Sequence, residues 1–375
     1  MEPIRILHVV ASLTKRGGVM SSIMNLYRNI NHTNIQFDFL VNNHKEPNYR
    51  EEIISYGGRI FDLPPLNKKN LIKYSNEVRS FFNNSDYDIL HCHVPAISPY
   101  ILYLAEKKGI KNRIIHSHGT MYGEGYLKSI RNYLSISMSK RNSNIYYACS
   151  HAAGQFMFGE KLMNNDQVTI INNAIDTNKF KFNKNLRRSL RKDLNIEDKL
   201  VIGHVGSFSP VKNHEFIIDI FHEVKNINNN SVLLLIGEGP LKKAIYEKVQ
   251  KLGLQDSVML LGTRTDINEL MQAMDVFVLP SYKEGFPVVS VEAQASGLNC
   301  FISNTVTKEV KLTNLVHLLS IKEDPKLWAT QIIKIYQNSY REDTSEQIIS
   351  KGFDTKINAK NLENYYKRLL SLNRQ

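Results

Sequence analysis

Short runs of apolar residues alternate along the chain with longer stretches that have the period of a helix. In the first half the apolar runs predict strands over residues 4–11, 37–41, 89–92, 114–116 and 145–148. Between them, residues 19–29 and 97–107 have apolar side chains every three or four positions, which predicts helices. This strand, helix, strand order predicts parallel strands in a doubly wound α/β sheet.

A second series of the same kind begins at residue 200. Its predicted strands are residues 200–206, 232–236, 258–261, 276–279 and 300–302. Turn residues over 172–180 and a charged helical stretch over 186–193 separate the two series. The chain has 375 residues, enough for two separate cores. We therefore predict two Rossmann-like domains, residues 1–180 and 181–357.

The composition and the start of the chain indicate the cellular compartment of the protein. Apolar residues make up 42% of the chain and charged residues 22%, and no apolar run approaches the ~18 residues that cross a bilayer. The first ten residues lack the basic start of a signal peptide and continue as a strand. Three scattered cysteines, Cys92, Cys149 and Cys300, do not make a disulfide framework. We expect a cytoplasmic protein.

The net charge of +12 favours polyanionic partners, such as acidic lipid surfaces, nucleotide phosphates or nucleic acid. The basic residues are dispersed and accompany no recognisable nucleic-acid module, so we do not expect nucleic acid as a partner. The sequence leaves the oligomeric state open.

Two glutamates eight positions apart, Glu284 and Glu292, flank a predicted helix N-terminus. Gly285 and Pro287 place Glu284 in a loop, and residues 288–295 read as a helix that carries Glu292. Free amides at a helix N-terminus bind anions, and carboxylates beside a bound phosphate can accept hydrogen bonds from sugar hydroxyls. Alternatively, one glutamate is solvated in a loop and the other only favours the helix dipole.

The segment from Glu284 to Glu292, with residues 275–281 before it and 292–297 around its end, resembles the Glu-x7-Glu signature of retaining glycosyltransferases of family 4. The resemblance covers nearly the whole chain and is densest over residues 203–303. It is strongest to bacterial enzymes that build capsular polysaccharides and exopolysaccharides.

This resemblance implies the GT-B architecture, two Rossmann-like domains facing across a cleft. The first domain would bind the acceptor, the second would bind a nucleotide-sugar donor, and a final helix over 358–375 would pack back on the first. The implied reaction is transfer of a hexose, with retention, from a UDP-linked sugar to a lipid-linked oligosaccharide or polysaccharide precursor. No cofactor and no metal are expected.

The resemblance also implies roles for single residues of the second domain. Glu292 would hold the ribose, and Glu284 would act on the sugar hydroxyls. The loop and helix start after Glu284 would add contacts to the donor through Gly285, Phe286, Pro287 and Val288. Thr263 and Arg264 would lie beside the nucleobase.

The loop from Gly206 to His214 follows the first strand of the second domain. Lys212 supplies a positive charge that suits a diphosphate leaving group, although a solvated loop lysine is the alternative. Family 4 enzymes commonly have an arginine directly after this glycine, where the present chain has Ser207. A serine donates one hydrogen bond and brings no charge, which puts donor affinity in question.

In the first domain, Gly17 and Gly18 follow the first strand and precede a helix. Their amides could face a diphosphate, or the pair could form a plain tight turn. The resemblance places them near the donor phosphates and the acceptor. The pattern is not the Gly-x-Gly-x-x-Gly fingerprint, which argues against a nicotinamide enzyme.

Two predicted strands of the first domain end in paired histidines, His91 with His93 and His116 with His118. Alternation along a strand puts both members of each pair on one face, at the carboxyl edge of the sheet. A zinc site is one interpretation, and clustering by sheet topology alone is the other, which we favour. The resemblance singles out His118 as a contact to the transferred sugar.

A helical stripe over residues 126–141 combines apolar and basic side chains. The stripe consists of Leu127, Ile130, Leu134 and Met138, with Lys128, Arg131, Lys140 and Arg141 around it. Such a helix can lie on an anionic membrane, or it can be an ordinary packed surface helix. With a lipid-linked acceptor, the first interpretation predicts an enzyme at the inner face of the cell membrane.

Two other functions remain open from the sequence. A sugar-nucleotide epimerase of the same architecture would need acidic and basic groups poised for proton abstraction. A catalytically silent subunit that binds a nucleotide sugar is the second alternative, and Ser207 motivates it.

Overall fold

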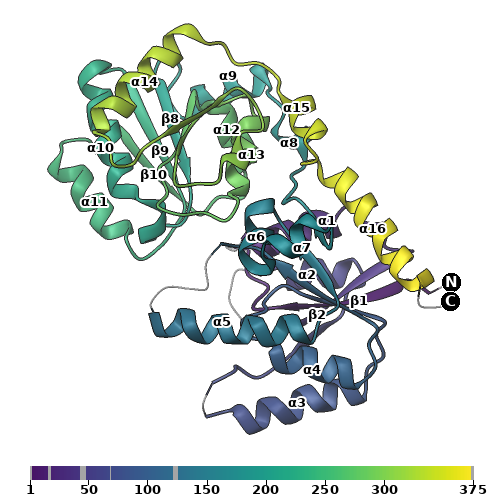
Figure 1. The fold of residues 1–375 in the computed structure, drawn as a ribbon. Helices are drawn as coiled ribbons and strands as arrows, with labels where there is room; N and C mark the ends of the chain where they lie inside the picture. Colours follow the sequence, from purple (N-terminus) through teal and green to yellow (C-terminus); the bar gives the residue numbers. More distant parts are fainter. Residues whose placement is uncertain (1, 16–17, 43–47, 68, 121–125, 373–375) are drawn as a thin grey trace. The chain divides into compact units, whose positions relative to one another are not determined.

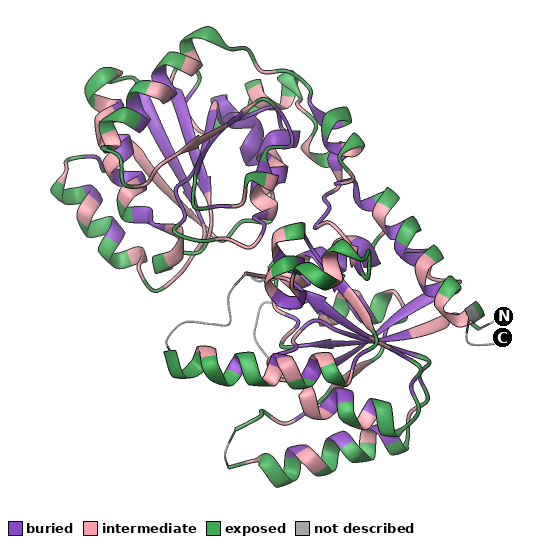
Figure 2. Ribbon diagram, viewed as in Figure 1, coloured by how far each residue is buried: buried purple, intermediate pink, exposed green. Residues whose placement is uncertain are grey.

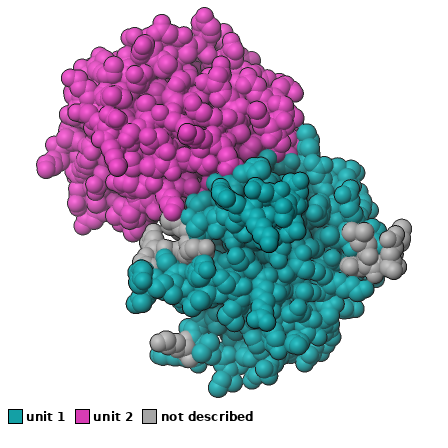
Figure 3. Space-filling model, in the orientation of Figure 1, with its two compact units in different colours: residues 1–174, 355–375 teal, residues 175–354 magenta. Residues whose placement is uncertain are grey.

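The computed structural model describes residues 2–15, 18–42, 48–67, 69–120 and 126–372. The chain divides into two compact units, residues 1–174 with 355–375, and residues 175–354 (Figure 3). The sequence-based boundaries after residues 180 and 357 fall slightly later along the chain than these limits, 174 and 354.

Unit 1 contains a seven-stranded parallel sheet in the order β3-β2-β1-β4-β5-β6-β7. Its strands are β1 (Ile4–Val10), β2 (Ile35–Val41), β3 (Ile60–Asp62), β4 (Ile89–Cys92), β5 (Asn112–Ser117), β6 (Ile145–Ala148) and β7 (Val168–Ile170). Five of these match the strands predicted from the apolar runs. The two that the sequence missed, β3 and β7, have three residues each, too few to show a periodic pattern.

Helices lie on both faces of this sheet (Figure 1). They are α1 (Gly18–Tyr27), α2 (Arg50–Ser55), α3 (Leu71–Asn83), α4 (Pro99–Lys107), α5 (Tyr126–Arg141), α6 (His151–Phe158), α7 (Glu160–Asn164) and α16 (Thr355–Leu372). Alternation along β1 sends Ile6 and Val10 into a core shared with α1 and α16. The intervening Leu7 and Val9 enter a second core with α3 and α4.

Unit 2 contains a six-stranded parallel sheet in the order β10-β9-β8-β11-β12-β13. Its strands are β8 (Leu200–Val205), β9 (Ser231–Ile236), β10 (Val258–Gly262), β11 (Val276–Leu279), β12 (Asn299–Ser303) and β13 (Val316–Leu319). The first five were predicted from the sequence, whereas the four-residue β13 was missed.

The helices of unit 2 again cover its sheet. They are α8 (Thr177–Phe180), α9 (Lys184–Asp193), η1 (Pro210–Lys212), α10 (His214–Ile227), α11 (Lys242–Lys251), α12 (Ile267–Ala273), α13 (Val288–Ala295), η2 (Lys308–Val310), α14 (Pro325–Asn338) and α15 (Ser345–Ser350). The core contains the buried Phe221, Phe301 and Trp328. Figure 2 shows the central strands buried and the outer helix faces exposed.

Each sheet reverses its strand order once, between β1 and β4 in unit 1 and between β8 and β11 in unit 2. In open α/β sheets, ligands bind beyond the carboxyl ends of the strands at such a switch point. We therefore expect the ligand sites at the loops that follow β1, β4, β8 and β11.

Candidate active site

Two loops at the carboxyl edge of the second sheet are joined by hydrogen bonds. The first follows β8 and contains η1, and the second follows β11 and leads into α13. The Asn213 side-chain amide donates to the Pro280 carbonyl at 3.2 Å, and the Tyr282 amide donates to the Val211 carbonyl at 2.9 Å. These bonds bring the predicted phosphate loop and the predicted sugar loop together.

Lys212 and Glu284 meet where these loops join. Lys212 Nζ lies 2.6 Å from Glu284 Oε1, and their side chains are only 18% and 15% exposed. A charge-assisted bond of this length in a half-buried place is stronger than a surface ion pair. Lys212, expected to bind the diphosphate, and Glu284, expected to bind the sugar, are thus each other's partner in this structure.

Helix α13 begins directly after this loop. Its N-cap, Pro287, makes no side-chain capping bond, and a proline cannot supply one. The eight-residue helix therefore begins without a side chain on its first amides, the arrangement that suits an anion. Phe286, just before the cap, is buried and stacks on Phe353 with ring centres 5.1 Å apart, which fixes the entry of the chain into the helix.

Glu292 is half-buried in α13, and its side chain forms no hydrogen bond with the residues that the structure describes. Burial raises the pKa of its carboxyl to about 7. A half-buried carboxyl group without a hydrogen-bond partner among the described residues can accept hydrogen bonds from hydroxyl donors. This property matches the ribose contact inferred for Glu292 from the family resemblance.

Glycines keep the phosphate loop close to its neighbour. A Cβ on Gly237, whose φ is +145°, would lie 2.0 Å from the Gly206 carbonyl oxygen. A Cβ on Gly206 would lie 2.8 Å from His204 Nε2 and 3.3 Å from Lys212 Cδ. Only a glycine at position 237 allows the two loops to approach this closely. Beyond the strand ends, the backbone and the Lys212 side chain are therefore not covered by a side chain at this position. Ser207 is exposed beside them and its hydroxyl donates to Ser209 Oγ at 3.2 Å.

Two histidines support the Lys212 loop and were not singled out from the sequence. His204 is buried with Nδ1 2.9 Å from the Val278 carbonyl oxygen, and His214 stacks on Phe208 with ring centres 4.1 Å apart. Burial lowers the pKa of both rings, that of His214 to about 4, so they are neutral beside the lysine. The available signal was the position of His204 near the end of a strand.

Thr263 and Arg264 follow β10 and are both exposed. Arg264 Nε donates to Asp266 Oδ1 at 2.8 Å, directly before α12. No hydrogen bond or ion pair joins either residue to Lys212 or Glu284 in the described parts of unit 2. The nucleobase contact of these two residues stays a prediction.

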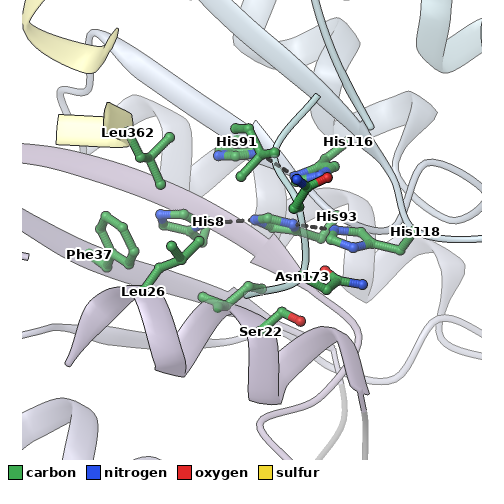
Figure 4. A pocket seen from close by; sticks show the side chains of 13 residues that line it. His8, Ser22, Leu26, Phe37, His91, His93, His116, His118, Asn173 and Leu362 are labelled. Carbon is green, nitrogen blue, oxygen red and sulfur yellow. Dashed lines mark hydrogen bonds between the residues drawn. The ribbon is translucent and has the colours of Figure 1, made fainter. Parts of the chain in front are cut away.

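Five histidines of unit 1 surround a small cavity of about 20 Å³ (Figure 4). They are His8, His91, His93, His116 and His118. The sequence identified the last four and missed His8, which stands opposite His91 in the β1–β4 register. Burial lowers the pKa of every ring, that of His118 to about 4, so all five are neutral near pH 7.

Two groups of three imidazoles, His8 with His91 and His93, and His93 with His116 and His118, have nitrogens within 4.8 Å of one another. However, the closest ring nitrogens lie 2.9 Å apart between His8 and His93, and 2.8 Å apart between His93 and His118. Two nitrogens bound to one tetrahedral zinc at ~2.0 Å are separated by about 3.3 Å. The rings are spaced for hydrogen bonds with each other, and a metal would have to push them apart.

The predicted glycine pair lies partly outside the described residues. Gly17 is not described. Gly18 is exposed and begins α1, and a Cβ on it would meet nothing within 4 Å. Packing among the described residues therefore does not require a glycine at position 18.

The apolar stripe of α5 faces away from unit 1. Leu127 is 82% exposed, Leu134 57% and Met138 59%. The face of α5 that packs against the unit instead contains the buried Asn132 and Ile136. Helix α5 thus packs on unit 1 through one face and leaves its apolar stripe exposed. Among the described residues, no helix has the length and apolar character needed to cross a bilayer.

Comparisons with known proteins agree with this architecture. Residues 187–354 match the model "Glycosyl transferases group 1" and residues 16–179 match "Glycosyltransferase Family 4". The chain is 35% identical over 371 residues, 96% of either chain, to a Bacillus subtilis protein named as a glycosyltransferase, EpsF.

A second relative is an Escherichia coli enzyme named for transferring galactose from UDP-Gal to GlcNAc-diphosphoundecaprenol. It is 28% identical over 258 residues, and the match covers 66% of each chain. Among solved structures, Anabaena HepE in complex with UDP-glucose superposes with a TM-score of 0.78 at 18% identity, covering 97% of this chain and 100% of that one. This likeness shows the GT-B fold.

The two parallel sheets, the family models that together span both units and the full-length relative all lead to one assignment. The chain belongs to the family 4 glycosyltransferases of the GT-B fold, and it is a glycosyltransferase related to enzymes of exopolysaccharide, capsule and lipid-linked glycan synthesis.

Proposed function

We propose that this glycosyltransferase transfers a hexose, with retention, from a UDP-linked sugar to a lipid-linked oligosaccharide at the inner face of the cell membrane. The observation that supports binding of a nucleotide-sugar donor is the Lys212–Glu284 ion pair at the carboxyl edge of the second sheet. A diphosphate is the kind of ligand that competes for Lys212, and sugar hydroxyls are the kind that bind a released Glu284.

In this proposal the donor is held along unit 2. Lys212, the Ser207 hydroxyl and the first amides of α13 take the diphosphate, and Glu292 takes the ribose hydroxyls. Glu284 and the amides of Gly285 to Val288 hold the hexose, and Thr263 and Arg264 lie beside the base. The raised pKa of Glu292 and its lack of a partner among the described residues support its part.

The chemical step proceeds on one face of the sugar. The bond between the anomeric carbon and the phosphate oxygen breaks while the acceptor oxygen bonds to the same face, and the acceptor proton passes to the departing phosphate. This path needs donors for the developing phosphate charge and no carboxylate nucleophile. Because Lys212 supplies that charge, we propose that transfer is independent of metal.

A second cavity, in unit 1, suits the lipid-linked acceptor. It has a volume of about 790 Å³ beyond the ends of β1, β2 and β4, in the range of ligand sites. Its walls include Leu66, Leu71 and Ile97, and α5 contributes Arg131. Asn42 is 5% exposed, and its Oδ1 has no hydrogen-bond partner within the described chain. An apolar wall with one cation and one buried acceptor fits an isoprenoid diphosphate sugar.

The exposed stripe of α5 supports docking at the membrane. Its apolar side chains alternate with Lys128 and Arg131, so burial of Leu127 and Leu134 in lipid would coincide with attraction to anionic headgroups. An amphiphilic acceptor in the membrane would then lie near the helix that lines the unit 1 cavity.

The direct test is incubation of the purified protein with labelled UDP-hexoses and extracted polyprenyl-diphosphate oligosaccharides. We expect label in the lipid fraction for one sugar, and equal turnover with and without EDTA. Isomerised sugar without acceptor would identify an epimerase, and donor binding without turnover on any extract would identify a silent subunit. Loss of turnover in EDTA that manganese restores would contradict metal independence.

A further inference from the structure

Three imidazoles of unit 1 form a continuous hydrogen-bonded chain (Figure 4). His8 lies in β1, His93 directly follows β4, and His118 directly follows β5. His8 Nδ1 is 2.9 Å from His93 Nε2, and His93 Nδ1 is 2.8 Å from His118 Nε2. His93 therefore uses both of its nitrogens within the chain.

The number of protons restricts this chain to two states. Burial keeps the three rings neutral, so each carries one N–H, and each of the two bonds needs one proton between its nitrogens. If His93 is protonated on Nε2, the other two rings must also be protonated on Nε2. If His93 is protonated on Nδ1, all three rings are protonated on Nδ1. Mixed arrangements place two protons or none in one of the bonds.

The two ends of the chain decide between these states. His8 Nε2 and His118 Nδ1 have no hydrogen-bond partner among the described residues. His8 is 1% exposed and packs against Phe37, with ring centres 4.1 Å apart. His118 is less buried as a residue, although its Nδ1 is covered like His8 Nε2. Either state leaves one N–H without a partner, and because the His8 ring packs against Phe37 and Phe39, the free proton is better placed at His118.

We propose that His8 and His93 are positioning residues that hold His118 as the Nδ1–H tautomer, so that His118 presents a hydrogen-bond donor to a substrate oxygen. The coupling of the three rings stands by itself. Its use toward a sugar oxygen rests on the proposed function.

A second series of hydrogen-bonded side chains in the same histidine cluster supplies a matched control for the His93 variant. The Tyr366 hydroxyl is 2.7 Å from His91 Nδ1, and His91 Nε2 is 3.1 Å from His116 Nδ1. The His116 and His118 rings stack with centres 4.0 Å apart, but no hydrogen bond joins the two series within the described residues. Tyr366→Phe removes one hydroxyl from the second series and leaves the first intact.

The experiment is ¹⁵N NMR of histidine side chains in the full-length protein, which distinguishes Nδ1–H from Nε2–H. In the wild type we expect His8, His93 and His118 all as Nδ1–H. In His93→Phe we expect His118 to shift toward the Nε2–H form that predominates in unconstrained neutral histidine. In Tyr366→Phe we expect no change at His118.

Three results would overturn the proposal. The first two are a mixture of Nδ1–H and Nε2–H among the three wild-type rings, and a His118 that keeps Nδ1–H in His93→Phe. The third, three Nε2–H rings, would leave the coupling in place but overturn the proposed Nδ1–H state of His118. Stoichiometric zinc in the purified protein would overturn the coupling too, because metal and N–H···N bonds need the same lone pairs. The wild-type spectrum decides the matter even if His93→Phe does not fold.

Measurement of turnover tests separately whether His118 donates a hydrogen bond to the substrate. His93→Phe should lower kcat/KM for the donor sugar tenfold or more while the affinity for free UDP, which lacks the sugar, is unchanged. If the tautomer shifts and turnover does not, His118 does not face the substrate as a donor. If the wild type turns over no sugar, the proposed function fails, and the NMR result still stands or falls by itself.

Discussion

Lys212 and Glu284 are 72 positions apart in the chain, yet Lys212 Nζ lies 2.6 Å from Glu284 Oε1. The pair joins the group expected to bind phosphate to the group expected to bind sugar. In the proposed binding mode, the donor breaks the Lys212–Glu284 ion pair. Lys212 then contacts the diphosphate, and Glu284 contacts the sugar hydroxyls. Four of the five predictions below concern this exchange and the residues around it.

Lys212→Ala should nearly abolish turnover and weaken binding of UDP by tenfold or more. A charge-assisted contact contributes ~1.5 to 3 kcal/mol, and each 1.4 kcal/mol is a factor of ten. The matched control is Lys242→Ala, which removes another lysine paired 2.6 Å from a glutamate of unit 2, Glu238. Calorimetry with UDP measures both variants, and equal losses would show that Lys212 has no special part.

Glu284→Gln should affect binding of the nucleotide and transfer of the sugar differently. The amide keeps the shape of the side chain but releases Lys212 from its ion pair, so the affinity for UDP should rise or stay constant. The sugar loses a charged acceptor, so kcat should fall tenfold or more. A parallel loss of UDP affinity and kcat would place Glu284 on the diphosphate instead of the sugar.

Ser207→Arg should tighten donor binding. Ser207 is exposed beside Gly206, where the family resemblance leads us to expect an arginine, and an arginine would add a charge for the diphosphate. We expect a tenfold lower Kd for UDP, measured with Ser209→Arg as the control for added charge nearby. If Ser207→Arg leaves Kd unchanged while the wild type turns over normally, another residue supplies the charge and the loop assignment is wrong.

Glu292→Gln should stabilise the unliganded protein in a pH-dependent manner. The folded-state pKa of Glu292, about 7, lies above the usual value of 4.5, so the unfolded chain releases this proton first as pH rises. Ionisation of Glu292 therefore lowers wild-type stability progressively from about pH 4.5 to above pH 7. The Tm advantage of Glu292→Gln should be absent near pH 4.5 and largest at pH 8.

The binding measurement completes this test. With UDP present at pH 8, Glu292→Gln should gain less from the ligand than the wild type does, since an amide is a weaker acceptor for the ribose hydroxyls. A Tm difference that does not change with pH would show that the Glu292 carboxyl has no raised pKa.

Leu127→Glu combined with Leu134→Glu should reduce binding to vesicles that contain anionic lipid by tenfold or more. Both side chains are exposed in the protein, at 82% and 57%, so the folded structure should retain its Tm. Ile54→Glu with Ile227→Glu, also exposed at 58% and 48%, is the matched control. Equal sedimentation of wild type and the α5 variant with vesicles would refute docking through α5.

Local pattern determined much of this protein. Alternation and helical periodicity were strong enough to place the long strands and the bounds of α5 and α13, because apolar residues recur in these elements at a fixed period. Gly285 and Pro287 located the start of the helix that carries Glu292 without any long-range information. The three-residue strands, such as β3, carry too few positions for a period and were missed, and so was the four-residue β13.

Contacts between distant segments were decided only by the tertiary structure. The Lys212–Glu284 ion pair depends on bonds between two loops, and no local rule fixes how loops from different strands meet. His8 joined the histidine cluster because parallel register sets it opposite His91, and one histidine in a strand gives no such signal. The stripe of α5 was readable in the sequence, whereas its direction was settled by the buried Ile136 and Asn132, which pack on the opposite side of the helix. A sequence gives the face that an element can bury, and only the packing of the whole unit selects the face that it does bury.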